Sequence, residues 1–180
     1  MSLGSQSDEI RRRPHRFTLV LGGARSGKSR YAETLLRSQP PPWIYVATAE
    51  PLDAEMQARI AEHRRRRDDR WQTIEAPRDL AGALRSVPLE ASVLIDCLTL
   101  WLANLVISES DLETETQHLQ EALAQMRAVV AVANEVGCGI VPENALARRF
   151  RDAAGQLNQR LAAVAERVVL VVAGLPMDLK

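Results

Sequence analysis

A glycine-rich turn between a predicted strand and a predicted helix constrains this chain more than any other stretch. Residues 17–21 (FTLVL) are apolar and predict a buried strand, and residues 30–37 (RYAETLLR) predict a helix. Between them lies GGARSGKS, which fits the pattern G-x-x-x-x-G-K-[ST] of a phosphate-binding P-loop. Because the strand and the helix supply the context that this motif requires, the chain is predicted to bind a nucleotide.

Each residue type in this turn has a physical role. Glycines allow the backbone to bring its N–H groups close to an anion, and the following helix points its positive end at the same place. Lys28 is predicted to contact the β- and γ-phosphates, and the Ser29 hydroxyl to ligate Mg²⁺. The predicted triphosphate-binding residues are Gly22, Gly23, Ala24, Arg25, Ser26, Gly27, Lys28 and Ser29.

The rest of the chain alternates apolar strands with helices. The strands are apolar on both faces, which indicates an α/β fold with a mostly parallel sheet flanked by helices. The further strands are predicted at 43–47, 71–75, 92–96, 128–133 and 168–173, and the further helices at 54–67, 79–85, 98–106, 112–126 and 143–167, the last with a candidate break at Gly155.

The length and composition set the broad class. A chain of 180 residues suits one domain with a sizeable core, predicted here over residues 17–180. Residues 1–16 are polar, without the apolar core of a secretory signal, and are predicted to form a disordered extension. Lysine plus arginine and aspartate plus glutamate both number 23, which argues against nucleic-acid binding through bulk charge.

The cysteines and the hydropathy of the chain argue against two further classes of protein, those held together by zinc or disulfides and those that span a membrane. The two cysteines, Cys97 and Cys138, lie far apart, so neither a zinc site nor a disulfide framework is expected and a reducing cytoplasm fits. No apolar run is long enough to span a bilayer, so no membrane span is predicted.

Polar residues at the carboxyl ends of the predicted strands are the candidates for chemistry, because ligands bind at that edge of such sheets. Asp96 ends an apolar strand and is predicted to hold Mg²⁺, although an N-cap for the next helix is the alternative. Asn134 and Glu135 follow another strand, where they either contact a ligand or simply connect strand and helix.

The segment EHRRRRDDR, residues 62–70, allows three interpretations. It can be a solvated helix end or a nucleic-acid patch, the latter weakened by Asp68 and Asp69. In the third interpretation His63 attacks a phosphoryl group, and the arginines neutralise a triphosphate and favour the neutral, nucleophilic imidazole. Residue chemistry alone leaves all three open.

Several segments together resemble one family. The chain from residue 17 to 180 is similar to the bifunctional adenosylcobinamide kinase / adenosylcobinamide-phosphate guanylyltransferases of cobalamin biosynthesis. The matching segments are GGARSGKSRYAE (22–33), YVATAEPLDAEMQARIAEH (45–63), W-x-T-x-E-x-P (71–77), LIDCLTLWLANL (94–105) and NEVGCGIVPENALARRFRDAAGQLNQRLA (134–162).

The resemblance implies two reactions at one nucleotide site. ATP or GTP phosphorylates the aminopropanol hydroxyl of adenosylcobinamide. GTP then donates GMP to adenosylcobinamide phosphate through a GMP–histidine intermediate, giving adenosylcobinamide-GDP and pyrophosphate. The family histidine follows an Arg-Ile pattern, which Arg59 and Ile60 match, so the resemblance implies that His63 is the nucleophile. Some members carry a second histidine where Glu62 stands here.

The resemblance also implies further contacts and an assembly. It implies nucleotide contacts in two segments, residues 47–49 and residues 64–67. It also implies an acidic nucleotide contact at Glu75 and an acidic nucleotide or metal contact at Asp96. It implies a RecA-like P-loop fold and a homotrimer, with the apolar helix after Asp96 at an interface. Another P-loop small-molecule kinase, or a regulator without turnover, stays an alternative. The two segments comprise Ala47, Thr48 and Ala49, and Arg64, Arg65, Arg66 and Arg67.

Overall fold

The computed structural model describes residues 16–180 except 52 and 66, so residues 1–15 and Arg66 lie outside the described part of the chain. Seven strands form one sheet in the order β3-β2-β4-β5-β1-β6-β7. The strands are β1 (Phe17–Gly22), β2 (Trp43–Ala47), β3 (Trp71–Glu75), β4 (Ser92–Asp96), β5 (Ala128–Asn134), β6 (Arg167–Val172) and β7 (Leu175–Asp178). Every pairing is parallel except that of β6 with β7.

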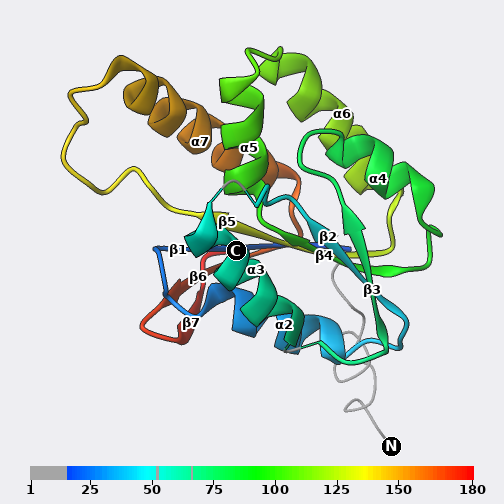
Figure 1. Cartoon of the computed structure of the whole chain (residues 1–180). Coiled ribbons are helices and arrows are strands. Elements are labelled where there is room, and N and C mark those ends of the chain that lie inside the picture. Colours follow the sequence, from blue (N-terminus) through cyan, green and yellow to red (C-terminus); the bar gives the residue numbers. More distant parts are fainter. Residues whose placement is uncertain (1–15, 52, 66) are drawn as a thin grey trace, which may run out of the picture.

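Helices cover both faces of this sheet (Figure 1). The helix that follows the P-loop, α2, packs on one face, and α4 to α7 lie on the other. Two separate clusters of buried apolar side chains fill the spaces between sheet and helices, which is why the strands are apolar on both sides. The helices are α2 (Lys28–Arg37), α3 (Ala54–Arg65), α4 (Leu80–Ser86), α5 (Leu98–Ile107), α6 (Leu112–Gln125) and α7 (Ala145–Val164).

The predicted fold class is confirmed, and most elements fall where the sequence places them. Short polar side chains begin several helices by accepting hydrogen bonds from backbone N–H groups that have no partner within the helix. Asp79 accepts from Gly82 N, and Asp111 accepts from the N–H groups of Glu113 and Thr114. The helix predicted to end at residue 126 ends at Gln125, so Met126 and Arg127 together separate α6 from β5.

The C-terminal region corrects two predictions. The helix predicted over 143–167 begins only at Ala145, because the Asn144 side chain caps it, and it runs to Val164 without a break at Gly155. The last predicted strand is followed by a second, antiparallel one. Ala173 and Gly174 both have positive φ angles and form the tight turn between β6 and β7.

Helix α3 stands apart from the core. Its described side chains are all exposed or half-buried, and it lies over the carboxyl edge of the sheet on the same side as α2 (Figure 1). Little apolar burial therefore holds α3 in place, and it can shift without disturbing either core cluster.

Trp101 on α5 anchors the helical layer opposite α2. Its side chain is 1% exposed, and its indole Nε1 donates to the carbonyl of Arg78 at 2.7 Å. Because Trp101→Ala leaves a cavity, we expect it to lower the free energy of unfolding by about 3–5 kcal/mol.

Denaturant titration followed by circular dichroism measures this loss. Ile107→Ala on the same helix is the control, since that side chain is 67% exposed and its loss should cost less than about 0.5 kcal/mol. Equal stability of the Trp101→Ala and Ile107→Ala variants would contradict the inference that Trp101 anchors the helical layer.

Candidate active site

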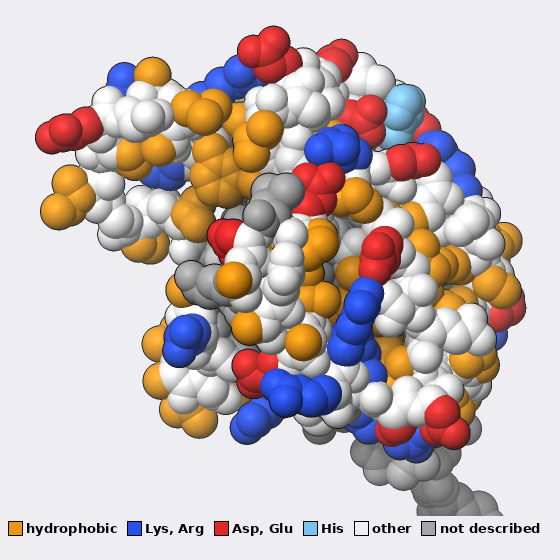
Figure 2. Space-filling model, viewed as in Figure 1, with side chains coloured by type: hydrophobic (Ala, Val, Ile, Leu, Met, Phe, Trp, Pro, Cys, Tyr) orange, Lys and Arg blue, Asp and Glu red, His pale blue; other side chains and the backbone are white. Residues whose placement is uncertain are grey.

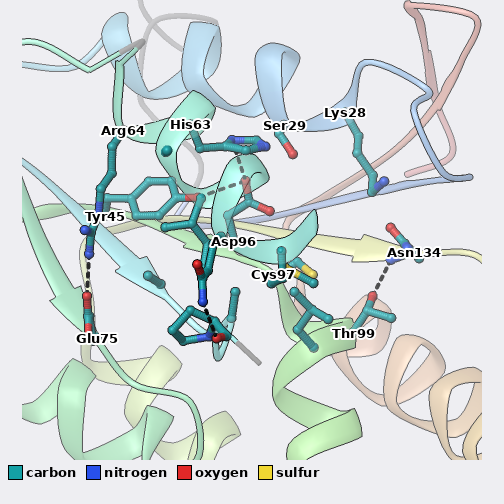
Figure 3. A pocket seen from close by; sticks show the side chains of 18 of the residues that line it. Lys28, Ser29, Tyr45, His63, Arg64, Glu75, Asp96, Cys97, Thr99 and Asn134 are labelled. Atoms are coloured by element: carbon teal, nitrogen blue, oxygen red, sulfur yellow. Dashed lines mark hydrogen bonds and ion pairs between the residues drawn. The ribbon is translucent and has the colours of Figure 1, made fainter. Parts of the chain in front are cut away.

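A cavity of about 460 Å³ opens at the carboxyl ends of the parallel strands (Figure 3). The P-loop forms one wall, α3 covers it, and the ends of β2, β4 and β5 with the start of α5 complete it. Candidate site residues that line the cavity are Ala24, Arg25, Lys28, Ser29, Ala47, Ala49, His63, Arg64, Arg67, Glu75, Asp96 and Asn134. Residues far apart in the sequence thus face one space.

The P-loop has the geometry of an anion cradle. Gly27 has a φ of +93°, and a Cβ there would lie 3.2 Å from the Cα of Gly174, so only glycine fits without strain. Immediately after it, α2 begins and directs its N-terminal N–H groups toward the loop. Lys28 is 8% exposed, and its ammonium donates to the Gly23 carbonyl at 2.9 Å. The loop therefore has a backbone conformation compatible with the predicted binding of phosphate.

Asp96 meets two other side chains in the cavity. Its Oδ2 accepts a hydrogen bond from the Tyr45 hydroxyl at 3.2 Å and lies 4.0 Å from His63 Nδ1 (Figure 3). Burial, and secondarily the charge of Asp96, raise the pKa of Tyr45 well above its ordinary value. The phenol therefore stays protonated and can donate to Asp96. Tyr45 carries no sequence signal of its own, because it looks like one more aromatic residue of a buried strand.

Arg64, in the last turn of α3, and Arg67, just after the helix, border the same space. Arg67 places its guanidinium 3.5 Å from the centroid of the Tyr45 ring, a cation–π contact. Arg64 pairs with Glu75 of β3 at 2.5 Å, and both side chains are more than half exposed. Because exposed pairs contribute less than about 1 kcal/mol, an entering nucleotide can displace this pair.

Some predicted contacts do not line the cavity. Thr48 is completely buried, and its hydroxyl donates to the Cys97 carbonyl at 2.7 Å and accepts from Cys97 N at 2.8 Å. Its side chain therefore supports the loop after β2, with no surface left for a nucleotide. The other predicted residues away from the cavity lining are Gly22, Gly23, Ser26, Gly27, Arg65 and Glu135.

Cys97 lines the cavity directly after Asp96. Burial is the main reason why the pKa of its thiol rises to about 11. At neutral pH the thiol is therefore protonated and a poor nucleophile. His63 is the better candidate for covalent chemistry in this cavity.

The oxygen ligands that Mg²⁺ prefers are present in the cavity. Ser29 supplies a hydroxyl and Asp96 a carboxylate, both on the lining, and such hard oxygen donors suit Mg²⁺. Among the described residues no group of three or more histidine, cysteine, aspartate or glutamate side chains could hold a metal ion. A metal here would thus depend on phosphate oxygens for its remaining ligands, as in other P-loop sites.

Comparison with known proteins identifies the family. The family model described as cobinamide kinase / cobinamide phosphate guanyltransferase matches residues 18–179. This chain belongs to that family. The bifunctional adenosylcobalamin biosynthesis protein CobP of Pseudomonas aeruginosa is 49% identical over 90% of this chain and 96% of its own length. CobU of Salmonella typhimurium is 43% identical over 90% of this chain and 98% of its own. Membership in the cobinamide kinase / guanyltransferase family confirms the resemblance and the expected transferase class.

Solved structures of low sequence identity share the fold. The flagellar accessory protein FlaH of Methanocaldococcus jannaschii aligns with a TM-score of 0.51 and 16% identity, over 98% of this chain and 85% of that one. A Pyrococcus horikoshii protein aligns with a TM-score of 0.53 and 8% identity, over 97% and 91%. In the described part of this family member, no helix is both long and apolar enough to cross a bilayer.

Tyr45→Phe tests how the cavity holds Asp96. The change removes only the hydroxyl that donates to Asp96, and a hydrogen bond to a charged group contributes about 1.5–3 kcal/mol. If Asp96 binds Mg²⁺, we expect the Mg²⁺ concentration for half-maximal kinase activity to rise about tenfold. A magnesium titration of the kinase reaction measures this shift. An unchanged titration, with unchanged thermal stability, would show that Asp96 does not depend on Tyr45.

Proposed function

We propose that this chain phosphorylates adenosylcobinamide with ATP or GTP and then transfers GMP from GTP to the product. The observation that carries the proposal is that His63 faces the same cavity as the P-loop residues Lys28 and Ser29. A kinase without guanylyl transfer would need the P-loop but would not need a histidine in this cavity.

The kinase step requires positioning and charge neutralisation. P-loop N–H groups and Lys28 would hold the β- and γ-phosphates. The hydroxyl oxygen of the aminopropanol group attacks the γ-phosphorus, the bond to the β-γ bridging oxygen breaks, ADP or GDP leaves, and the hydroxyl proton passes to water. Mg²⁺, held by Ser29 and Asp96, would neutralise charge on the phosphates when bound.

The guanylyl step uses the α-phosphorus of GTP. The neutral imidazole of His63 attacks with Nε2, because Nδ1 faces Asp96, and pyrophosphate leaves as the P–N bond forms. A phosphate oxygen of adenosylcobinamide phosphate then attacks the same phosphorus and breaks the P–N bond. Adenosylcobinamide-GDP forms and the imidazole is regenerated. Arg64 and Arg67 line the cavity and would neutralise the phosphates during both transfers.

Helix α3 allows one cavity to serve both steps. His63 lies near Asp96, and α3 rests on the edge of the core without a buried side chain among those described. A small shift of α3 would bring His63 to the α-phosphorus after the kinase step has cleared the site. We further propose that the chain works as a homotrimer in the cytoplasm, where nucleoside triphosphates are available.

Covalent labelling tests the proposal. The chain is incubated with Mg²⁺ and GTP labelled at the α-phosphorus, then denatured and examined for retained label. We expect label that is acid-labile and base-stable, as a phosphoramidate is, and none from GTP labelled at the γ-phosphorus. If the chain binds nucleotide but retains no label after denaturation, the remaining interpretations are a kinase without guanylyl transfer and a nucleotide-dependent regulator.

A further inference from the structure

The connection between β5 and α7 is an exposed apolar segment. It leaves the sheet after Asn134 and projects beyond the carboxyl edge (the yellow loop in Figure 1). Ile140 is 97% exposed and Val141 59%, and Leu146 in the first turn of α7 is 52% exposed. In Figure 2 this part of the surface carries apolar side chains interspersed with polar ones. Such a group of exposed apolar side chains commonly marks a binding surface.

The base of this segment is part of the active-site wall. Asn134 lines the cavity, and its N–H donates to Thr99 Oγ1 at 2.6 Å (Figure 3). The next residue, Glu135, donates its N–H to the carbonyl of Gly22 at the start of the P-loop. The segment thus leaves the cavity between the P-loop and α5, on the Lys28 side of the site.

The projecting part has internal supports. The Glu135 carboxylate accepts from Gly137 N at 2.6 Å, and Arg148 of α7 donates to the Pro142 carbonyl at 2.9 Å. These bonds fix both ends of the segment and leave the apolar tip at Ile140 and Val141 facing outward. The segment therefore has a supported base at the cavity wall, at Asn134, and an apolar tip that projects outward from it.

The size of the acceptor substrate explains why such a surface is needed. A cavity of about 460 Å³ lies toward the small end of ligand sites, which range from about 300 to 1,000 Å³. A ligand site of this size encloses about one drug-sized molecule, so a nucleoside triphosphate and a corrinoid macrocycle cannot both fit inside it. The hydroxyl of the acceptor must still come within about 3.5 Å of the γ-phosphorus. The macrocycle must therefore rest on the surface beside the cavity mouth.

We propose that Ile140, Val141 and Leu146 form the surface on which the corrinoid macrocycle of the acceptor packs, with its aminopropanol arm passing Asn134 into the cavity. This inference rests on the proposed function and adds the position of the acceptor. The segment takes no part in forming the GMP–enzyme, because that half-reaction involves GTP and the nucleotide-binding residues but no corrinoid. The two half-reactions therefore respond differently to changes in the segment.

Steady-state kinetics of serine variants test the inference. For Ile140→Ser combined with Leu146→Ser, we expect the KM for adenosylcobinamide to rise at least about tenfold, because two apolar contacts are lost. Formation of GMP–enzyme from GTP alone should stay within about twofold of the unchanged chain. Leu89→Ser is the matched control, since Leu89 is 54% exposed but lies before β4, at the opposite end of the strands.

Chemical protection provides a second test without altering the segment. Cys138 is exposed on it, whereas Cys97 is buried, so a maleimide reagent should modify Cys138 selectively. We expect saturating adenosylcobinamide to slow this modification at least about fivefold, and GTP alone to leave its rate unchanged.

Three outcomes would overturn the inference. An unchanged KM together with unprotected Cys138 would place the corrinoid elsewhere. A changed sedimentation coefficient with an unchanged KM would assign the segment to a contact between copies of this chain. Absence of both GMP–enzyme formation and adenosylcobinamide phosphorylation in the unaltered chain would overturn the proposed function, and the inference with it.

Discussion

His63→Ala is expected to abolish guanylyl transfer while leaving much of the kinase activity. The imidazole would form the covalent bond to GMP, and removing a nucleophile commonly lowers the rate by about 10⁴-fold or more. The kinase step needs no nucleophile from the protein, so its rate should fall less than about tenfold. Two quantities are measured on the same preparation of the variant: the covalent label retained from GTP labelled at the α-phosphorus, and the rate of adenosylcobinamide phosphorylation.

His118→Ala is the matched control for that experiment. His118 is exposed on α6, which does not contribute to the cavity lining. Both activities of the control should equal those of the unaltered chain. Retained label in His63→Ala would assign the covalent intermediate to another residue and would remove the main support for the proposed function.

Lys28→Ala is expected to impair both reactions. Lys28 is buried at the start of α2 beside the P-loop, where its charge would meet the developing negative charge of the transferred phosphoryl group. Removing one such electrostatic contact typically lowers kcat by about 10²–10³-fold. We expect a loss of this size in the kinase step and a smaller loss in GMP–enzyme formation, which takes place at the α-phosphorus.

Arg30→Ala separates this effect from a general loss of positive charge. Arg30 lies on the same helix two residues later, and its side chain is exposed. Its removal should leave both rates within about twofold of the unaltered chain, since exposed charges are screened by solvent. If Lys28→Ala and Arg30→Ala behaved alike in single-turnover assays, Lys28 would have no specific role in phosphoryl transfer.

The sequence by itself determined the parts of this protein that depend on local patterns. Strands such as 43–47 and 92–96 were predictable because apolar runs of about five residues that contain β-branched or aromatic side chains favour a buried strand over a helix. The P-loop was predictable because its turn needs glycine at fixed positions, as the positive φ of Gly27 shows. The family was recognisable from residues near His63 and from the segment after Asn134.

Other features depended on contacts between distant parts of the chain. The antiparallel strand β7 escaped prediction because Leu175–Asp178 is short and exposed, and only its pairing with β6 makes it a strand. Thr48 was expected to contact the nucleotide, but its side chain turns inward to the backbone of Cys97. Neither the pairing of β7 with β6 nor the inward orientation of the Thr48 side chain produces a periodic pattern that can be recognised in the sequence.

The arrangement of the site was decided by the tertiary structure. Tyr45, His63 and Asp96 come from β2, α3 and β4, and they meet because β2 and β4 are neighbours with their carboxyl ends at one edge. Strand order results from long-range packing, which residue patterns within one segment do not encode. The sequence therefore determined which groups could carry out the chemistry, and the order of the strands decided which of them face one another.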